Sequence, residues 1–211
     1  MLVLVTASYC CYRYYLTVQF NDSLTTHVKQ SSLRLANSSR FETDDKANIG
    51  IAELIRQLEQ DIQEIDKKIL EIQTLNSVRF HEECDSSVAY LRTGQDFLRA
   101  LIGKYKAFQI KSIAFEYAQT CLADFKKFLN GDLAGERRLS SMHQATCVDA
   151  TAKLAEAHDV YTQAQANVAA SAIKLQEVRD TVKKSVSEDA LVSPDLLSDI
   201  AKKNTRNKEA K

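Results

Sequence analysis

Between Ile51 and Ile72 the chain places an aliphatic residue alternately four and three positions apart. This spacing makes one apolar stripe along a helix, and its mean period of about 3.5 residues is typical of a left-handed coiled coil. Leu54, Leu70 and Leu75 widen the stripe, as expected for a helix that touches two neighbours in a bundle,. We call this stripe the isoleucine seam, and its members are Ile51, Ile55, Leu58, Ile62, Ile65, Ile69 and Ile72.

The charges beside the isoleucine seam bear on what covers it. In a parallel homodimer, Asp61 of one chain would lie opposite Asp66 of the other, which is a repulsion with no compensating ion pair. We therefore expect the seam to pack on later helices of the same chain. A homo-oligomer that uses the seam as its interface is the alternative.

A second helical pattern spans residues 78–129. It is interrupted by Gly94 and Gly103, either of which could bend or break a helix. Large residues recur on its apolar positions and are expected to fill the space between helices; they are Val88, Leu91, Leu98, Ile102, Tyr105, Ile113, Tyr117, Phe125 and Phe128, with Cys121 among them.

A third pattern spans residues 136–186 and repeats every seven positions. Beside its bulky positions runs a row of mostly small residues, which lets a neighbouring helix approach closely. The bulky row is Leu154, Tyr161, Val168, Leu175 and Val182, and the adjacent row is Ala157, Ala164, Ser171 and Val178.

Composition supports the same fold class. Five glycines and one proline in 211 residues leave few helix breakers,. We predict an all-α protein, an elongated antiparallel bundle of three long helices with coiled-coil packing, over residues 44–187. Ser193 and Pro194 predict the start of a short helix within residues 188–211, followed by a basic tail.

The amino-terminal segments do not fit this pattern. Residues 1–20 are apolar with one charge, Arg13, and are expected to form an irregular or extended arm,. A signal peptide or membrane anchor is the alternative interpretation, and Cys10 and Cys11 would then be candidates for acylation. Residues 21–43 are rich in Ser, Thr and Asn and predict a linker.

The charge balance and the cysteines indicate which partners and which cellular compartment the sequence favours. The chain has 28 basic and 28 acidic residues, so no overall field attracts nucleic acid or an anionic membrane,. Its five cysteines are scattered, which favours a reducing, cytoplasmic compartment,. We expect the three that lie within helical patterns, Cys84, Cys121 and Cys147, to behave as small buried apolar residues.

Motifs for catalysis are absent from the sequence. It has no phosphate-binding loop, dinucleotide fingerprint or nucleophile elbow, and none of its four histidines follows a carboxylate by three residues,. The best cluster, from His81 to Asp85, offers two or three ligands where a closed zinc site needs four. We expect no enzymatic activity, cofactor or metal.

Two functions fit these patterns. The first is a non-enzymatic interaction or scaffold protein that presents helical surfaces to protein partners. The second is a membrane-associated rod, either anchored by residues 1–20 or binding anionic lipid through a basic helix face. The residues that would form this face are Lys104, Lys106, Lys111, Lys126 and Lys127.

Overall fold

The computed structural model of the chain describes residues 2–43, 50–75, 80–129 and 137–205. Helices account for nearly all of these residues and none of them lies in a strand, so the predicted all-α class is confirmed. The expected start of the bundle at residue 44, the interval between the second and third helical patterns and the end of the basic tail lie outside the described residues. The elements are α1 (Leu2–Thr43), α2 (Ile51–Leu75), α3 (His81–Leu129), α4 (Arg137–Val182), the short 3-10 helix η1 (Glu188–Ala190) and α5 (Pro194–Thr205).

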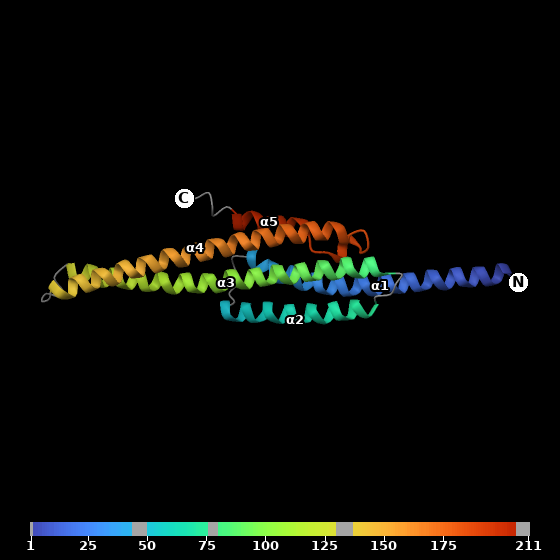
Figure 1. The fold of residues 1–211 in the computed structure, drawn as a ribbon, viewed down its shortest axis with the longest axis horizontal. Helices are drawn as coiled ribbons and strands as arrows, with labels where there is room; N and C mark the ends of the chain where they lie inside the picture. Colours follow the sequence, from blue (N-terminus) through green and yellow to red (C-terminus); the bar gives the residue numbers. More distant parts are fainter. Residues whose placement is uncertain (1, 44–49, 76–79, 130–136, 206–211) are drawn as a thin grey trace.

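The molecule is a rod in which α3 and α4 run antiparallel to each other and α1 extends furthest at the opposite end (Figure 1). The middle of the rod, where α1, α2 and α5 lie alongside these two helices, we call the body. Two parts extend beyond the body in opposite directions. One is the amino-terminal part of α1, and the other is the distal hairpin, which we define as residues 110–127 of α3 and 144–160 of α4.

Helix α1 corrects two sequence-based expectations, since the predicted arm (1–20) and linker (21–43) form one continuous helix. The feature that indicates a helix here is a face of small and apolar residues, which packs on α2, α3 and α5. Serine has weak helix propensity, but its small side chain allows close approach, and burial of a helix face outweighs propensity. The buried residues of this face are Phe20, Leu24, Val28, Ser31, Ser32, Leu35, Ser38, Ser39 and Glu42.

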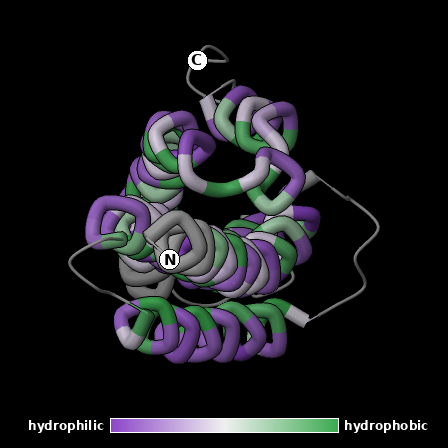
Figure 2. The backbone as a smooth tube through the Cα atoms, turned by 90° about the vertical axis from the view of Figure 1, so that its right-hand side faces the viewer, coloured by the Kyte–Doolittle hydropathy of each residue, from purple (hydrophilic) through white to green (hydrophobic). Residues whose placement is uncertain are grey.

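The isoleucine seam on α2 packs within the chain, against α3 and α1. Figure 2 shows α2 as the lowest helix, with its hydrophobic positions turned toward the other helices. Asp66 accepts a hydrogen bond from Gln95 of α3 at 2.7 Å, and Asp61 accepts one from Ser38 of α1 at 2.6 Å. The two carboxylates that disfavour parallel self-pairing thus bind neighbouring helices of their own chain.

Helix α3 continues through both glycines, and the two positions differ in their surroundings. A Cβ atom built at Gly94 would lie 2.6 Å from Cδ1 of Leu35, whereas at Gly103 it would meet nothing within 4 Å. Gly94 therefore permits the close approach of α1 to α3, as a glycine in a helix interior often does. Gly103 has no such role.

A buried polar cluster holds the carboxyl-terminal segment on the body. The Tyr90 hydroxyl accepts a hydrogen bond from the backbone N–H of Val192 at 3.1 Å and lies 3.1 Å from Oγ of Ser32. Arg179, which is buried, donates to the carbonyl of Val192 at 2.8 Å and to Glu188 at 2.9 Å. Burial raises the pKa of Tyr90 above its usual value,.

Candidate interaction surface

Small residues line the contact between the two helices of the distal hairpin. We call this contact the alanine seam, and it continues the row of small residues seen in the sequence of α4. Because the side chains at the contact are short, the helices approach closely and larger side chains are left outside it. The alanine seam comprises Ala114, Ala118 and Cys121 on α3 and Cys147, Ala150 and Ala157 on α4; Ala107 and Ala164 continue it toward the body.

A disulfide bond joins the two helices within the alanine seam. Cys121 and Cys147 are bonded, with their Cα atoms 5.5 Å apart. Ala118, Ala150 and the partly buried Phe125 pack around it in a small cluster separate from the core of the body. The expectation that these two cysteines are unpaired buried residues is therefore wrong. Since disulfides persist mainly in oxidising compartments, the argument for a cytoplasmic location loses its support from cysteine usage.

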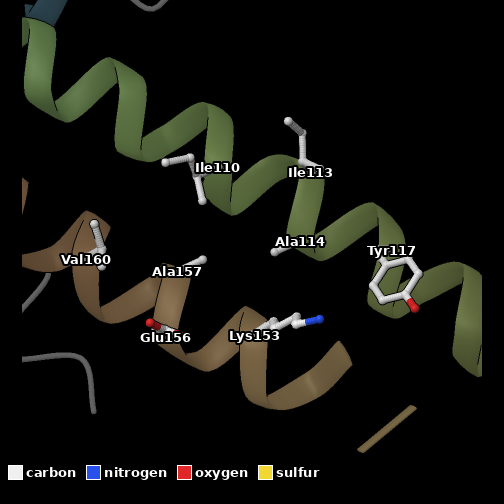
Figure 3. A pocket seen from close by; sticks show the side chains of 8 residues that line it. All are labelled: Ile110, Ile113, Ala114, Tyr117, Lys153, Glu156, Ala157 and Val160. Atoms are coloured by element: carbon white, nitrogen blue, oxygen red, sulfur yellow. The ribbon is translucent and has the colours of Figure 1, made fainter. Parts of the chain in front are cut away.

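An apolar groove runs along one side of the distal hairpin, beside the alanine seam. Its volume is about 570 Å³. Four of its residues come from α3 and four from α4, and Figure 3 shows Ile110 and Ala157 pointing toward the space between the two helices. The lining residues are Ile110, Ile113, Ala114, Tyr117, Lys153, Glu156, Ala157 and Val160.

The side chains of this groove are unusually exposed for their size. Ile113 exposes 68% of its surface and Ile110 exposes 56%. The pattern of residues 78–129 places Ile113 on the apolar face. The expectation for Ile113 and Tyr117 is therefore corrected: the alanines beside them make the contact with α4, and the bulky residues flank it. A contiguous exposed apolar surface is the usual mark of an interaction site.

Two charged residues of α4 lie at the edge of the groove. Lys153 forms an ion pair with Asp149 at 2.8 Å, and the hydrogen bond to Asp149 raises the pKa of Lys153. Glu156 is exposed, one helical turn further along the same helix. The groove thus offers one charge of each sign beside an apolar strip.

A second cluster of interest lies at the end of the body nearest the distal hairpin. Glu42 of α1 is buried and pairs with the buried Lys104 of α3. It also accepts a hydrogen bond from the Tyr105 hydroxyl at 2.6 Å and one from Nδ2 of Asn204 at 3.3 Å. Burial, and next the charge of Glu42, raise the pKa of Tyr105 far above its usual range,. The cluster joins α1, α3 and α5.

The cavity beside this cluster is smaller than the groove, at about 250 Å³. Glu42 and Lys104 line it together with Phe108 and Tyr161. Because the two charges satisfy each other, we assign the cluster a structural role in joining three helices. It brings together residues that the sequence did not connect, since Glu42 lay in the expected linker.

The five lysines expected to form a basic face occupy different surroundings. Lys104 is buried in the cluster described above, where lipid cannot reach it. Lys106 lies 3.8 Å from Glu59, Lys127 lies 3.8 Å from Asp124, and Nζ of Lys111 lies 4.9 Å from the centre of the Tyr161 ring. Lys126 is exposed.

The segment from His81 to Asp85 forms the first turn of α3. His81 lies 3.2 Å from Asp85, and Cys84 is a buried free cysteine whose thiol pKa is raised by burial. Within residues 2–43, 50–75, 80–129 and 137–205, no group of three or more His, Cys, Asp and Glu side chains is arranged to hold a metal ion.

The amino-terminal part of α1 presents aromatic residues to solvent. Tyr12, Tyr14 and Tyr15 are all exposed, as is Cys11. Among the described helices, none combines the length and the apolar character needed to cross a membrane.

No protein-family model, curated protein or solved structure matches this chain.

Proposed function

We propose that this protein is a non-enzymatic coiled-coil interaction or scaffold protein that presents helical surfaces to protein partners. The observation that supports the proposal is the apolar groove of the distal hairpin, where bulky aliphatic side chains flank a narrow seam of alanines. We also propose coiled-coil packing between α3 and α4, from the seven-residue spacing of their contact positions.

The contrast between the isoleucine seam and the groove supports this assignment. Leu58, Ile65 and Ile72 are fully buried within the chain, so the isoleucine seam is not free to bind a partner. The groove lies on a two-helix element that projects from the body (Figure 1). Two antiparallel helices with an apolar strip along one side form a natural platform for a further helix, which would bury the strip in a bundle.

The experiment compares two single variants of the full chain as baits. Ile113→Asp places a charge in the groove, whereas Gln119→Asp places the same charge on an exposed position of the same helix outside the groove lining. We expect proteins that are crosslinked to the wild type from cell extract to be lost with Ile113→Asp and retained with Gln119→Asp. Identical captured sets for all three baits, together with a monomeric wild type, would contradict the proposal.

A membrane-associated rod is the second candidate, and α1 supplies the observation that favours it. The exposed Tyr12, Tyr14 and Tyr15 lie on the projecting part of α1, where residues 2–20 contain one charge, and tyrosine prefers the interface between water and lipid headgroups,. We expect, under this candidate, that the full chain pellets with anionic vesicles at physiological salt. Replacing the three tyrosines by serine would then release it, and equal pelleting of both proteins would exclude this route.

A further inference from the structure

We propose that the groove of the distal hairpin is closed by the same groove of a second copy, in a twofold-symmetric, antiparallel four-helix arrangement. This inference rests on the proposed function, because it names the partner of the same surface. The evidence is the way in which apolar and charged residues are spaced about one point of the groove.

The disulfide fixes which residues of α3 and α4 lie at the same level along the hairpin. Cys121 is level with Cys147, and since the helices are antiparallel, a step backward along α3 matches a step forward along α4. The midpoint of Ile110 and Tyr117 lies 7.5 residues before Cys121. The midpoint of Lys153 and Glu156 lies 7.5 residues after Cys147. The two midpoints therefore coincide in level.

A twofold axis crossing the groove at that level gives complementary contacts on both helices. On α3, Ile110 would face Tyr117 of the second copy, and Ile113 would lie next to its own symmetry mate. On α4, Lys153 would face Glu156 of the second copy, and the reverse pair would form by symmetry. The interface would thus bury the apolar strip and pair unlike charges twice. A copy related by an axis along the hairpin would instead set α4 against α3 of the second copy, and no pair of Lys153 with Glu156 would form.

The symmetry also favours a second copy over other occupants. A twofold interface uses one patch twice, so both exposed strips are covered in a closed dimer. The exposed part of α1 is another apolar element, and its docking into the groove of a further copy can continue head-to-tail from one copy to the next. It would produce assemblies larger than a dimer that grow with concentration, and this outcome would overturn the proposal.

The main test is sedimentation equilibrium on the full chain and four variants, with circular dichroism to verify folding. We expect a dimer that Ile113→Asp dissociates, with a dissociation constant raised at least 100-fold. Lys153→Glu and Glu156→Lys should each weaken the dimer about tenfold, because each turns two ion pairs into two repulsions. The double variant Lys153→Glu/Glu156→Lys should restore it. A monomeric wild type, or a dimer indifferent to these changes, would overturn the proposal.

Covalent trapping tests the position of the axis. In a background with Cys10 and Cys11 replaced by serine, Ile113→Cys should give a disulfide-linked dimer on mild oxidation, since Ile113 lies beside the axis. Gln119→Cys, exposed on the same helix, is the matched control and should stay monomeric. Equal crosslinking of the two would overturn the proposed axis.

The outcomes separate this inference from the proposed function. A monomeric chain that still captures proteins through Ile113 would leave the interaction role intact and refute the second copy as occupant. A monomer that captures nothing through Ile113 would refute both.

Discussion

The body and the distal hairpin are built from the same two helices but stabilised in opposite ways. In the body, α3 has neighbours on several sides, and its bulky residues Phe97, Leu98 and Leu101 are fully buried. In the distal hairpin it meets α4 alone in Figure 1, through alanines and a disulfide, and Ile110 and Ile113 remain exposed. The number of neighbouring helices, more than the sequence of α3, decides which side chains become core.

Polar groups follow the same division. The body buries ionic and hydroxyl groups such as Glu42, Lys104 and Tyr90, each with a partner on another element. The distal hairpin keeps its charged groups at the surface, as with Lys153 and Asp149. Removing one member of a buried pair strands a charge away from water, while removing an exposed one does not.

The largest difference between the two regions should appear with the carboxylates Glu42 and Glu156. We expect Glu42→Ala to lower the free energy of unfolding by about 3–5 kcal/mol, because the Lys104 charge stays buried without its partner. Glu156→Ala should change it by less than about 0.5 kcal/mol in a monomer. Guanidinium unfolding followed by circular dichroism, with Ile113→Asp present in both proteins to exclude association, measures both values.

A combined variant controls for the nature of the Glu42 effect. In Glu42→Leu/Lys104→Met/Tyr105→Phe, Glu42 and two of its three partners become apolar, while Asn204 keeps its hydrogen bond to the Ile200 carbonyl. Most of the stability should then return. If the triple variant is as unstable as Glu42→Ala, the loss comes from packing and not from the stranded charge.

Loss of the disulfide should affect the hairpin and spare the body. We expect Cys121→Ala/Cys147→Ala to reduce the local stability of the hairpin by about 2–4 kcal/mol. Hydrogen exchange measures this, with amides near Ala118 and Ala150 exchanging faster and those near Leu58 and Ile65 unchanged. Equally faster exchange in both regions would mean that the rod unfolds as one unit.

The two glycines of α3 should respond to alanine with opposite signs. Gly94→Ala should lower stability by about 1–3 kcal/mol, since its Cβ atom would displace Leu35 of α1,. Gly103→Ala should raise it by about 0.5–1 kcal/mol, because a methyl group there meets only solvent and stiffens the unfolded chain,. The denaturation midpoints of the two variants measure this, and equal shifts would contradict the close contact at Gly94.

The smallest expected effect concerns pH and the body residue His27. Burial lowers the pKa of His27, against the opposing charge of Glu71. The unfolded chain, with a His pKa of about 6.5, then binds the proton more readily than the folded one. Stability should fall as pH drops below about 6.5 and level off below the folded pKa. Urea midpoints at several pH values should show a shallower slope for His27→Gln, and an unchanged slope would refute the contribution.

The sequence predicted the helices whose apolar residues follow a strict spacing. The segments expected at residues 78–129 and 136–186 correspond to α3 and α4, and the helix expected at Pro194 is α5. The sequence did not predict α1, because Ser31, Ser38 and Ser39 occupy buried positions that usually carry apolar residues. These serines favour a helix only by allowing close packing on a neighbouring helix, and the sequence does not identify that neighbour.

The candidate surface was harder to predict than the helices. Periodicity identified Ile113 and Tyr117 as helix residues on an apolar face, but it could not tell a face covered by a neighbour from one left open,. The disulfide was missed for a related reason. Cys121 and Cys147 lie far apart in sequence. They come to the same level only because α3 and α4 pack side by side with one particular alignment.

The disulfide has a consequence for the alignment of the two helices. A row of alanines repeating every seven residues looks nearly the same after one helix slides along the other by two turns, so the contact itself specifies alignment weakly. The bond between Cys121 and Cys147 removes that degeneracy. The bond fixes the alignment of α3 against α4 at one point, and this alignment keeps Ile110 and Val160 on opposite sides of the same groove.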